Sequence, residues 1–204
     1  MALITDTHSR RAKYMQALAL GLPCLHLRWL SDCVAKQLIL PFSPYLLPAG
    51  ESAFLSGAVR SRLLTPYDAA TARLSVIIAG RSKLLEGMSV LLITGKGKIE
   101  ERRKAYLFLT HALGVAKVVK VPNLEAAKAM LAEGGKWDWV YVDGKVDEAE
   151  RVLFGSGEDK TKAGRKRKRE SESADPFEAK KDRTAKVVTD EFVIQSLILG
   201  ALME

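Results

Sequence analysis

The stretch "RWLSDC", residues 28–33, contains the spacing that decides the fold. Trp29 precedes Cys33 by four positions, directly after the apolar run "PCLHL". Residues four apart lie on one face of a helix, so the ring can pack into a sheet while the small thiol lets the helix approach closely. We therefore expect a helix over residues 28–40 that ends at Pro41, with Trp29 and Cys33 in the core.

A similar stretch, "EFVIQS", lies near the other end of the chain at residues 191–196. Phe192 takes the place of the tryptophan and Ser196 the place of the cysteine, again four positions apart. The echo predicts that the chain contains two related units, each with one helix packed on a sheet through such a pair. Two unrelated amphipathic helices would give the same spacing, so periodicity alone leaves that alternative open.

The remainder of the chain alternates between apolar strands and amphipathic helices. Helices are predicted where apolar residues recur every three to four positions, and strands where apolar residues are continuous or alternate. This alternation favours an α/β fold in which helices flank parallel sheets. The predicted helices are 10–21, 28–40, 98–114, 123–135 and the last residues of the chain, and the predicted strands lie within 2–5, 22–27, 84–94, 116–121, 137–144 and the residues from 185 onward.

The net charge of +8 is concentrated in one segment. Residues 157–169, "GEDKTKAGRKRKR", hold seven Lys/Arg and two Asp/Glu, a net charge of +5. Residues from about 155 to 185 are mostly charged or small, so they bury too little apolar area to offset the entropy of ordering and are expected to be disordered. We interpret the basic run as a nuclear import signal, with nucleic-acid contact as the alternative.

The sequence argues against several other functional classes. No apolar run is long enough to span a membrane, and the first residues lack the apolar core of a secretory signal. We expect an intracellular protein in which Cys24 and Cys33 are reduced thiols. Neither a zinc-ligand spacing nor a plausible Ser/His/Asp set is present, so we expect no catalysis, no cofactor and no metal.

Four stretches of the sequence are more specific than a periodic pattern, and together they resemble a known family. A strand followed by Trp-x-x-x-Cys resembles the helix that marks the BRCT family of phosphopeptide-binding modules, which also tolerates Phe192 and Ser196 at these positions. More narrowly, the chain resembles the tandem BRCT region of the DNA-damage checkpoint mediators, namely the fungal checkpoint adaptors and the vertebrate p53-binding mediator. The stretches that carry this resemblance are "DTHSRRAKY" (6–14), "GLPCLHLRWLSDCVAKQL" (21–38), "YLLPAG" (45–50) and "EFVIQSLILG" (191–200).

The resemblance implies tandem BRCT repeats, each a parallel four-stranded sheet flanked by helices. Residues 1–50 match the C-terminal half of a first repeat, beginning at its third strand, so the first repeat is expected to be incomplete. Residues 51–83 form the linker between the repeats. Residues 84–204 match a second repeat that carries the basic insertion at about 155–185. The Ser/Thr–Gly turn that related first repeats use to bind phosphate lies outside this match.

Arg10 and Lys13 are the best candidates for a binding site. They are three positions apart at the start of a predicted helix, where backbone N–H groups and the helix dipole favour an anion. The resemblance implies that Lys13 contacts a phosphate and Arg10 the peptide backbone or a carboxylate, with Arg11 as a weaker neighbour. A solvated basic first turn is the alternative.

A second anion site is conceivable at the strand–loop–helix stretch "LLITGKGKIE", residues 91–100. This stretch lacks the Walker A spacing, so a nucleotide-binding enzyme is not expected. In terms of the resemblance, Thr94 and Gly95 occupy the turn at which a first repeat binds phosphate, and Arg151 could assist them. The ordinary alternative is that the glycine permits a tight turn.

The sequence thus predicts a non-enzymatic scaffold of the DNA-damage checkpoint, located in the nucleus at chromatin. Its expected partners are a Ser-Gln-phosphorylated histone tail, checkpoint proteins and a second copy of itself, with weak or indirect DNA contact and no membrane. Two alternatives stay open. One is a nucleic-acid-binding module that uses the basic insertion, and the other is a structural BRCT fragment without a working phosphate pocket.

Overall fold

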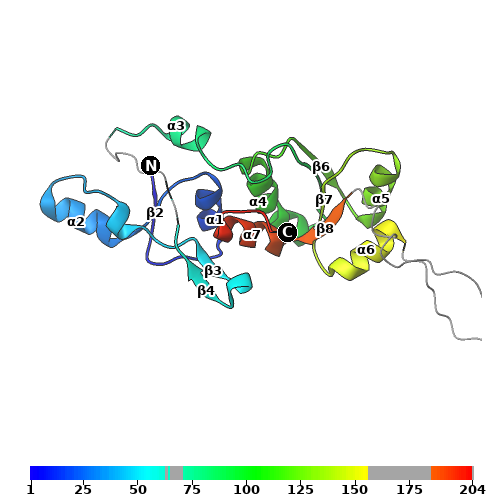
Figure 1. The fold of residues 1–204 in the computed structure, drawn as a ribbon, viewed down its shortest axis with the longest axis horizontal. Helices are drawn as coiled ribbons and strands as arrows, with labels where there is room; N and C mark the ends of the chain where they lie inside the picture. Colours follow the sequence, from blue (N-terminus) through cyan, green and yellow to red (C-terminus); the bar gives the residue numbers. More distant parts are fainter. Residues whose placement is uncertain (63, 65–70, 156–184, 204) are drawn as a thin grey trace, which may run out of the picture.

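The structure is a computed structural model that describes residues 1–62, 64, 71–155 and 185–203 (Figure 1). The basic insertion at about 155–185, which is predicted to be disordered, lies outside these ranges except for its two end residues. In the described chain, a small two-stranded N-terminal unit and a four-stranded C-terminal unit are joined through the packed helices α1, α4 and α7.

The C-terminal unit is built on a four-stranded parallel sheet. Its strands are β5 (Ser89–Ile93), β6 (Lys117–Val121), β7 (Trp139–Val142) and β8 (Lys186–Thr189), in the order β6-β5-β7-β8. The central strands β5 and β7 are almost wholly buried, which explains their continuous apolar sequences, because parallel sheets are covered on both faces. The predicted parallel four-stranded sheet is confirmed for this unit.

Helices cover both faces of this sheet. Successive strand residues point to opposite faces, so Leu92 packs on the side of α4 (Lys98–Ala112) and α7 (Asp190–Leu199). Leu91 packs on the side of α5 (Leu124–Ala132) and α6 (Val146–Phe154). Asn123 begins α5 as predicted, because its side-chain oxygen accepts a hydrogen bond from the Ala126 N–H at 2.8 Å.

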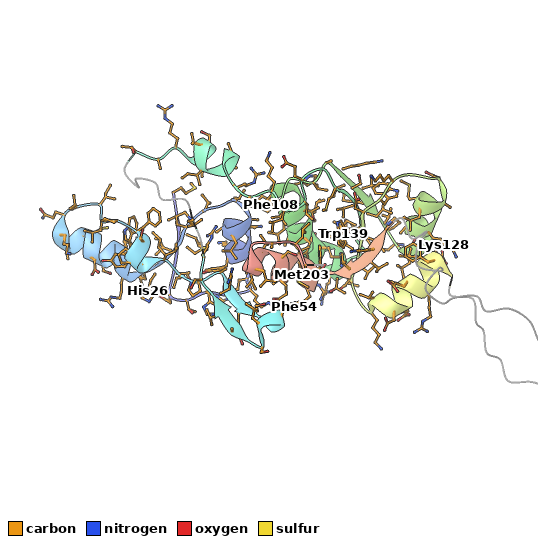
Figure 2. All side chains as sticks on the ribbon, viewed as in Figure 1. His26, Phe54, Phe108, Lys128, Trp139 and Met203 are labelled. Carbon is orange, nitrogen blue, oxygen red and sulfur yellow. The ribbon has the colours of Figure 1, made fainter. Side chains whose placement is uncertain are left out.

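The aromatic and small residues of "EFVIQS" are in the core. Phe192 is buried, and its ring centroid lies 4.6 Å from that of Trp139 on β7, the residue labelled in Figure 2. Ser196, one turn later on the same helix, is also buried. Its small side chain accepts a hydrogen bond from the Met203 N–H at 3.3 Å, so the residues after α7 fold back over this helix.

The N-terminal unit contains two short parallel strands and two helices. These are β1 (Leu3–Thr5), α1 (Ala12–Ala19), β2 (Cys24–His26) and α2 (Arg28–Lys36). Helix α1 packs against α4 and α7 of the C-terminal unit and belongs to the same hydrophobic cluster. The contact between the two units is therefore a three-helix interface rather than a contact between sheets.

The predicted core positions of Trp29 and Cys33 are wrong. Helix α2 has no buried residue, and both side chains are only half-buried. They fasten the chain after the helix instead: Trp29 Nε1 donates to the Leu40 carbonyl at 3.0 Å, and the Leu40 N–H donates to Cys33 Sγ at 3.3 Å. Two strands of three residues offer too little sheet surface to bury this helix. The helix also ends earlier than predicted, because Gln37 is left-handed with φ 52°.

The linker is more structured than its sequence indicated. It contains the short 3₁₀ turn η2 (Ala53–Leu55) and helix α3 (Leu74–Ala79), and a further 3₁₀ turn, η1 (Ser43–Tyr45), precedes it. Strands β3 (Gly50–Ser52) and β4 (Ala58–Arg60) form an antiparallel hairpin below α7, with η2 at its tip (Figure 1).

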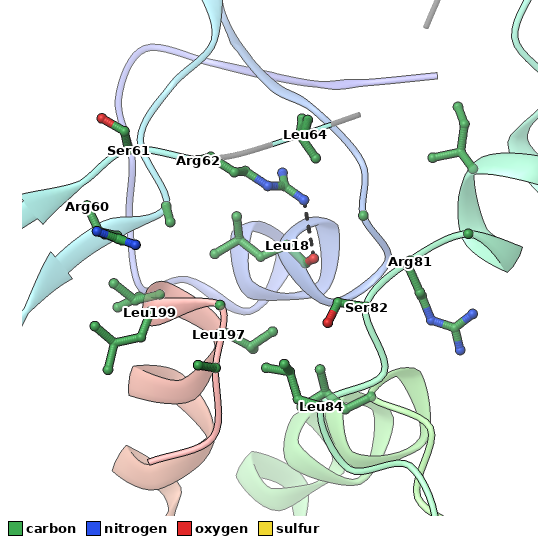
Figure 3. Close-up of a pocket in the computed structure, with 18 of the residues that line it drawn as sticks. Leu18, Arg60, Ser61, Arg62, Leu64, Arg81, Ser82, Leu84, Leu197 and Leu199 are labelled. Atoms are coloured by element: carbon green, nitrogen blue, oxygen red, sulfur yellow. Dashed lines mark hydrogen bonds between the residues drawn. The ribbon is translucent and has the colours of Figure 1, made fainter. Parts of the chain in front are cut away.

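Two linker arginines bind the carbonyl ends of helices. Arg62 donates to the carbonyls of Leu18 at 3.2 Å and of Leu22, at the end of α1. Arg81 donates to the Ala112 carbonyl at 2.6 Å, at the end of α4. Helix C-termini carry partial negative charge, so these contacts are favourable. A cavity of about 960 Å³ lies between the linker and the ends of α1 and α7. Arg62 and Leu18 are among the residues that border it (Figure 3).

Candidate functional site

The N-terminus of α1 is basic and uncapped. The helix begins after Arg11, whose backbone is extended and whose side chain makes no capping hydrogen bond. The first backbone N–H groups of a helix have no partner within it, and no acidic residue lies in this first turn. Arg10, Arg11 and Lys13 are exposed around it. The end of the helix therefore combines unsatisfied donors with three positive side chains.

The other described helices of eight or more residues have an acidic residue or a side-chain acceptor near their N-termini, and of these α5 alone has a side-chain capping hydrogen bond. Helices α4, α5, α6 and α7 each have one or two acidic residues in the first turn. At the start of α2, the Arg28 N–H donates to His26 Nδ1 at 3.1 Å. Among these helices, α1 is the one that combines three exposed basic side chains with neither an acidic residue nor a capping side chain in its own first turn.

Arg10 reaches across the interface between the two units. Its guanidinium is paired with the carboxylate of Glu191 in the first turn of α7. The same carboxylate oxygen accepts a hydrogen bond from Gln195 Nε2 at 2.7 Å, and Gln195 Oε1 accepts one from the Ser52 hydroxyl at 3.0 Å. Gln195 and Ser52 are buried, so Arg10 is held by a chain of hydrogen bonds that ends in the linker hairpin. Arg11 and Lys13 form no ion pair within the described residues.

The "YLLPAG" connector holds α1 in place. The Tyr14 hydroxyl, on the first turn of α1, donates to the Pro48 carbonyl, and the Leu47 N–H donates to the Cys24 carbonyl at 2.8 Å. Burial raises the pKa of Tyr14 well above its ordinary value, so this hydroxyl stays protonated and remains a donor. The connector thus fixes the helix whose N-terminus carries the basic cluster.

The second predicted anion site is not assembled in the same way. The Thr94 hydroxyl donates to the Val121 carbonyl at 3.3 Å. Gly95 has a φ of +69°, and a Cβ at this position would lie 2.8 Å from the Ile99 side chain, so the turn itself requires glycine. Arg151 is exposed on α6 and makes no polar contact with either residue among the described contacts. The acidic Asp143 lies at the same edge of the sheet, paired with an arginine of α4, so a second anion site there stays a prediction.

A buried ion pair lies beside the Arg10–Glu191 contact. Arg103 on α4 is 1% exposed, and its Nη1 lies 3.2 Å from Asp190 Oδ1, at the start of α7. Neither atom has hydrogen-bond geometry to a partner, and the Tyr141 hydroxyl nearby on β7 has none either. Burial raises the pKa of Asp190 to about 6, because removal from water costs the carboxylate more than Arg103 restores. The sequence carried no signal for this pair, because Arg103 is one of two adjacent arginines on an amphipathic helix.

The burial of Asp190 predicts a pH dependence of stability. The folded protein binds this proton with a pKa of about 6, whereas the ordinary pKa of the unfolded chain is 3.8. The folded state therefore takes up the proton first, and this group makes the protein more stable as the pH falls from about 6 to about 4. The gain is at most about 3 kcal/mol. Urea unfolding at several pH values measures this gain. If the free energy of unfolding of an Asp190→Asn variant changes with pH as steeply as that of the unmodified protein, the dependence belongs to another group.

The described residues contain no group of three or more His, Cys, Asp or Glu side chains that could hold a metal ion. No described helix is both long enough and apolar enough to cross a membrane.

Comparison with solved structures gives the class of protein. The BRCT5–BRCT6 domains of S. pombe Brc1 match with a TM-score of 0.56 at 16% identity, covering 98% of this chain and 78% of that chain. A likeness at this identity shows the fold: the chain has the tandem BRCT architecture, as predicted.

Sequence comparison narrows the class to particular relatives. The chain is 30% identical over 131 residues to the DNA repair protein crb2 of Schizosaccharomyces pombe, covering 60% of this chain and 17% of crb2. It is 31% identical over 135 residues to the DNA repair protein RAD9 of Saccharomyces cerevisiae, covering 60% of this chain and 10% of RAD9. The chain is therefore homologous to crb2 and RAD9, which confirms the predicted resemblance, and it spans less than a fifth of either relative. No family model matches it.

Proposed function

We propose that the chain is a non-enzymatic phosphopeptide-binding module that reads a Ser-Gln-phosphorylated histone tail in the DNA-damage checkpoint. The observation that supports this function is the uncapped N-terminus of α1 with Arg10, Arg11 and Lys13 around it. A phosphoserine carries nearly two negative charges at pH 7 and three strong acceptor oxygens. Free helix N–H groups and a lysine ammonium are the donors that such a group requires.

The three basic residues have different roles in this proposal. Lys13, on the exposed face of the first turn, gives a point charge to the phosphate. Arg10 has a planar fork, of which one side is paired with Glu191, and the remaining donors contact the peptide backbone or a carboxylate of the peptide. Arg11 adds charge to the same end of α1. The phosphate and the flanking peptide are thus recognised by side chains of the N-terminal unit, one of which, Arg10, is positioned by Glu191 of the C-terminal unit.

The relatives support the cellular setting of the proposal. Both are DNA repair proteins, which favours a nuclear protein at damaged chromatin with checkpoint proteins as partners. Residues 1–50, 51–83 and 84–204 then correspond to a partial first repeat, a linker and a second repeat. Self-association through the BRCT surface belongs to the same proposal.

Substitution of Lys13 by glutamine tests the site. We expect Lys13→Gln to weaken binding of a pSer-Gln histone-tail peptide by about 10- to 100-fold, because a hydrogen bond to a charged group contributes about 1.5–3 kcal/mol. Binding of the unphosphorylated peptide should not change. Fluorescence anisotropy measures both affinities, and Lys128→Gln, which alters an exposed lysine on α5, is the matched control.

The same titrations separate the alternatives. If the protein binds both peptides equally but binds duplex DNA with an affinity that falls steeply with salt, a nucleic-acid-binding module replaces the proposal. If it binds neither the phosphopeptide nor DNA, the structural fragment without a working pocket is correct.

A further inference from the structure

Two helices at the interface between the units end in the same way. Helix α1 is followed by Leu20 and Gly21, and helix α4 by Leu113 and Gly114. The glycines have φ values of +72° and +84°, a left-handed backbone that ends a helix and favours glycine. Helix α5 ends likewise before Gly134, whose φ is +80°, and a Cβ there would have no atom of the described residues within 4 Å. Gly134 therefore shows what such a helix end requires when nothing packs against it.

The linker packs directly against Gly21 and Gly114. A Cβ on Gly21 would lie 3.1 Å from the Cβ of Arg81, and a Cβ on Gly114 would lie 2.7 Å from the Cβ of Lys83. Both distances are shorter than an ordinary carbon–carbon contact, so the missing side chain at each glycine leaves room for the linker. Arg81 and Lys83 are two positions apart, so one short stretch, residues 81–83, lies against the ends of both helices. Figure 3 shows Arg81 at the start of this stretch, beside α1.

Hydrogen bonds fasten the same stretch to two helix ends. Arg81 Nε donates to the Ala112 carbonyl in the last turn of α4, and Arg81 Nη1 donates to the Ile78 carbonyl in α3, each at 2.6 Å. The Leu85 N–H, two residues beyond the stretch, donates to the Leu113 carbonyl at 2.9 Å. A guanidinium suits this position because helix C-termini carry partial negative charge. Arg81 therefore binds α3 and α4 through its guanidinium and lies against the end of α1 through its Cβ.

Helix α1 is thus held near both of its ends. It has 8 residues, which makes it about 12 Å long. Near its N-terminus, Arg10 is paired with Glu191 of α7. At its C-terminus, residues 81–83 lie between Gly21 and the end of α4. A short rigid helix that is held at both ends cannot pivot against its neighbours, whereas a helix that is held at one end can.

We propose that residues 81–83 form a clasp that fixes the angle of α1 against α4, and that Arg81 is thereby a positioning residue for the phosphopeptide site. The clasp keeps Arg10 opposite Glu191 at the other end of α1. The part of this proposal that concerns the peptide rests on the proposed function. The part that concerns the angle describes the protein without a ligand and does not rest on it.

Two glycine substitutions test the clasp without any ligand. Gly114→Ala and Gly134→Ala place a Cβ on nearly the same left-handed backbone, so both should lower the free energy of unfolding. Gly114→Ala alone must also push Lys83 away from the end of α4. A displacement of about 1 Å restores an ordinary contact distance and turns a helix about 12 Å long by about 5°. Residual dipolar couplings of the backbone amides measure the angle between the two units, which we expect to change in Gly114→Ala and to stay the same in Gly134→Ala.

Two linker arginines test the effect on the peptide. Arg81→Ala removes both hydrogen bonds of the guanidinium, and we expect it to weaken binding of the pSer-Gln peptide by at least about threefold. Arg60→Ala alters an exposed arginine of the same linker and should change binding by less than about twofold. In an Arg10→Gln background, the loss caused by Arg81→Ala should disappear, because Arg81 acts through Arg10. A general loss of stability would not depend on Arg10.

The clasp is wrong if Gly114→Ala leaves the angle between the units unchanged, or if both glycine variants change it equally. Arg81 is not a positioning residue if Arg81→Ala and Arg60→Ala cause equal losses of binding, or if the loss from Arg81→Ala persists in full beside Arg10→Gln. If the unmodified protein does not bind the phosphopeptide, the proposed function fails, and the angle measurement alone decides whether the clasp exists.

Discussion

Replacement of Arg103 by methionine is expected to lower the free energy of unfolding by about 3–5 kcal/mol at pH 7. Arg103 is 1% exposed and is the cation paired with Asp190, whose side chain is 18% exposed. Without it, the pKa of Asp190 rises further, so the folded protein must either keep an unpaired carboxylate in a poorly solvated site or take up a proton at pH 7, and methionine fills the space but offers no donor. Urea unfolding followed by circular dichroism measures the change.

Arg102 gives a matched control for this substitution. It is the neighbouring arginine on α4, its side chain is 60% exposed, and it is also paired with an aspartate, Asp143. Exposed pairs contribute at most about 1 kcal/mol, so Arg102→Met should cost little. Adding Asp190→Leu to Arg103→Met should recover most of the lost stability, because the uncompensated charge is then gone. Equal losses in the two single variants would show that burial of this pair is not what matters.

Truncation of Phe192 to alanine should cost about 3–5 kcal/mol. Its ring is buried against Trp139 at 4.6 Å and meets Tyr141 edge-on at 6.4 Å between centroids. The alanine would leave a cavity between α7 and the sheet that the rigid surrounding strands cannot fill. Thermal or urea unfolding of the variant gives the value.

Trp29, the counterpart of Phe192 in the N-terminal unit, should behave differently. It is half-buried, and its main contact is one hydrogen bond to the Leu40 carbonyl. We expect Trp29→Ala to cost about 1–2 kcal/mol, from that bond and a partial loss of apolar contact. If it costs as much as Phe192→Ala, then α2 is packed more tightly than its exposure indicates.

The sequence was sufficient to predict the C-terminal unit because its signals are local. Alternation in residues 116–121, a continuous apolar run in β5 and the Asn123 cap each reflect a nearby backbone arrangement. Phe192 and Ser196 are buried as expected, because the helix that carries them packs against a four-stranded sheet.

Other features depend on contacts between residues far apart in the sequence. Local sequence patterns do not predict such contacts. Ile99 on α4 is 43% exposed although it is apolar, whereas Arg103 one turn later is buried, with Asp190 opposite it. The linker arginines Arg62 and Arg81 donate hydrogen bonds to carbonyls at the ends of two separate helices. For the candidate site, the basic residues near Lys13 were predicted, but the Glu191–Gln195–Ser52 chain that holds Arg10 was not.

The exposed face of α2 has a practical consequence for the protein in solution. Leu30 and Val34 on α2 are 49% and 70% exposed, and Leu38, just after the helix, is 63% exposed, so three large apolar side chains of this segment face solvent. At high protein concentration, exposed apolar side chains of different molecules associate with one another. We therefore expect contacts at α2 to cause apparent oligomers, turbidity and non-specific retention on hydrophobic resins. A Val34→Lys variant should stay dispersed at concentrations at which the unmodified chain scatters light.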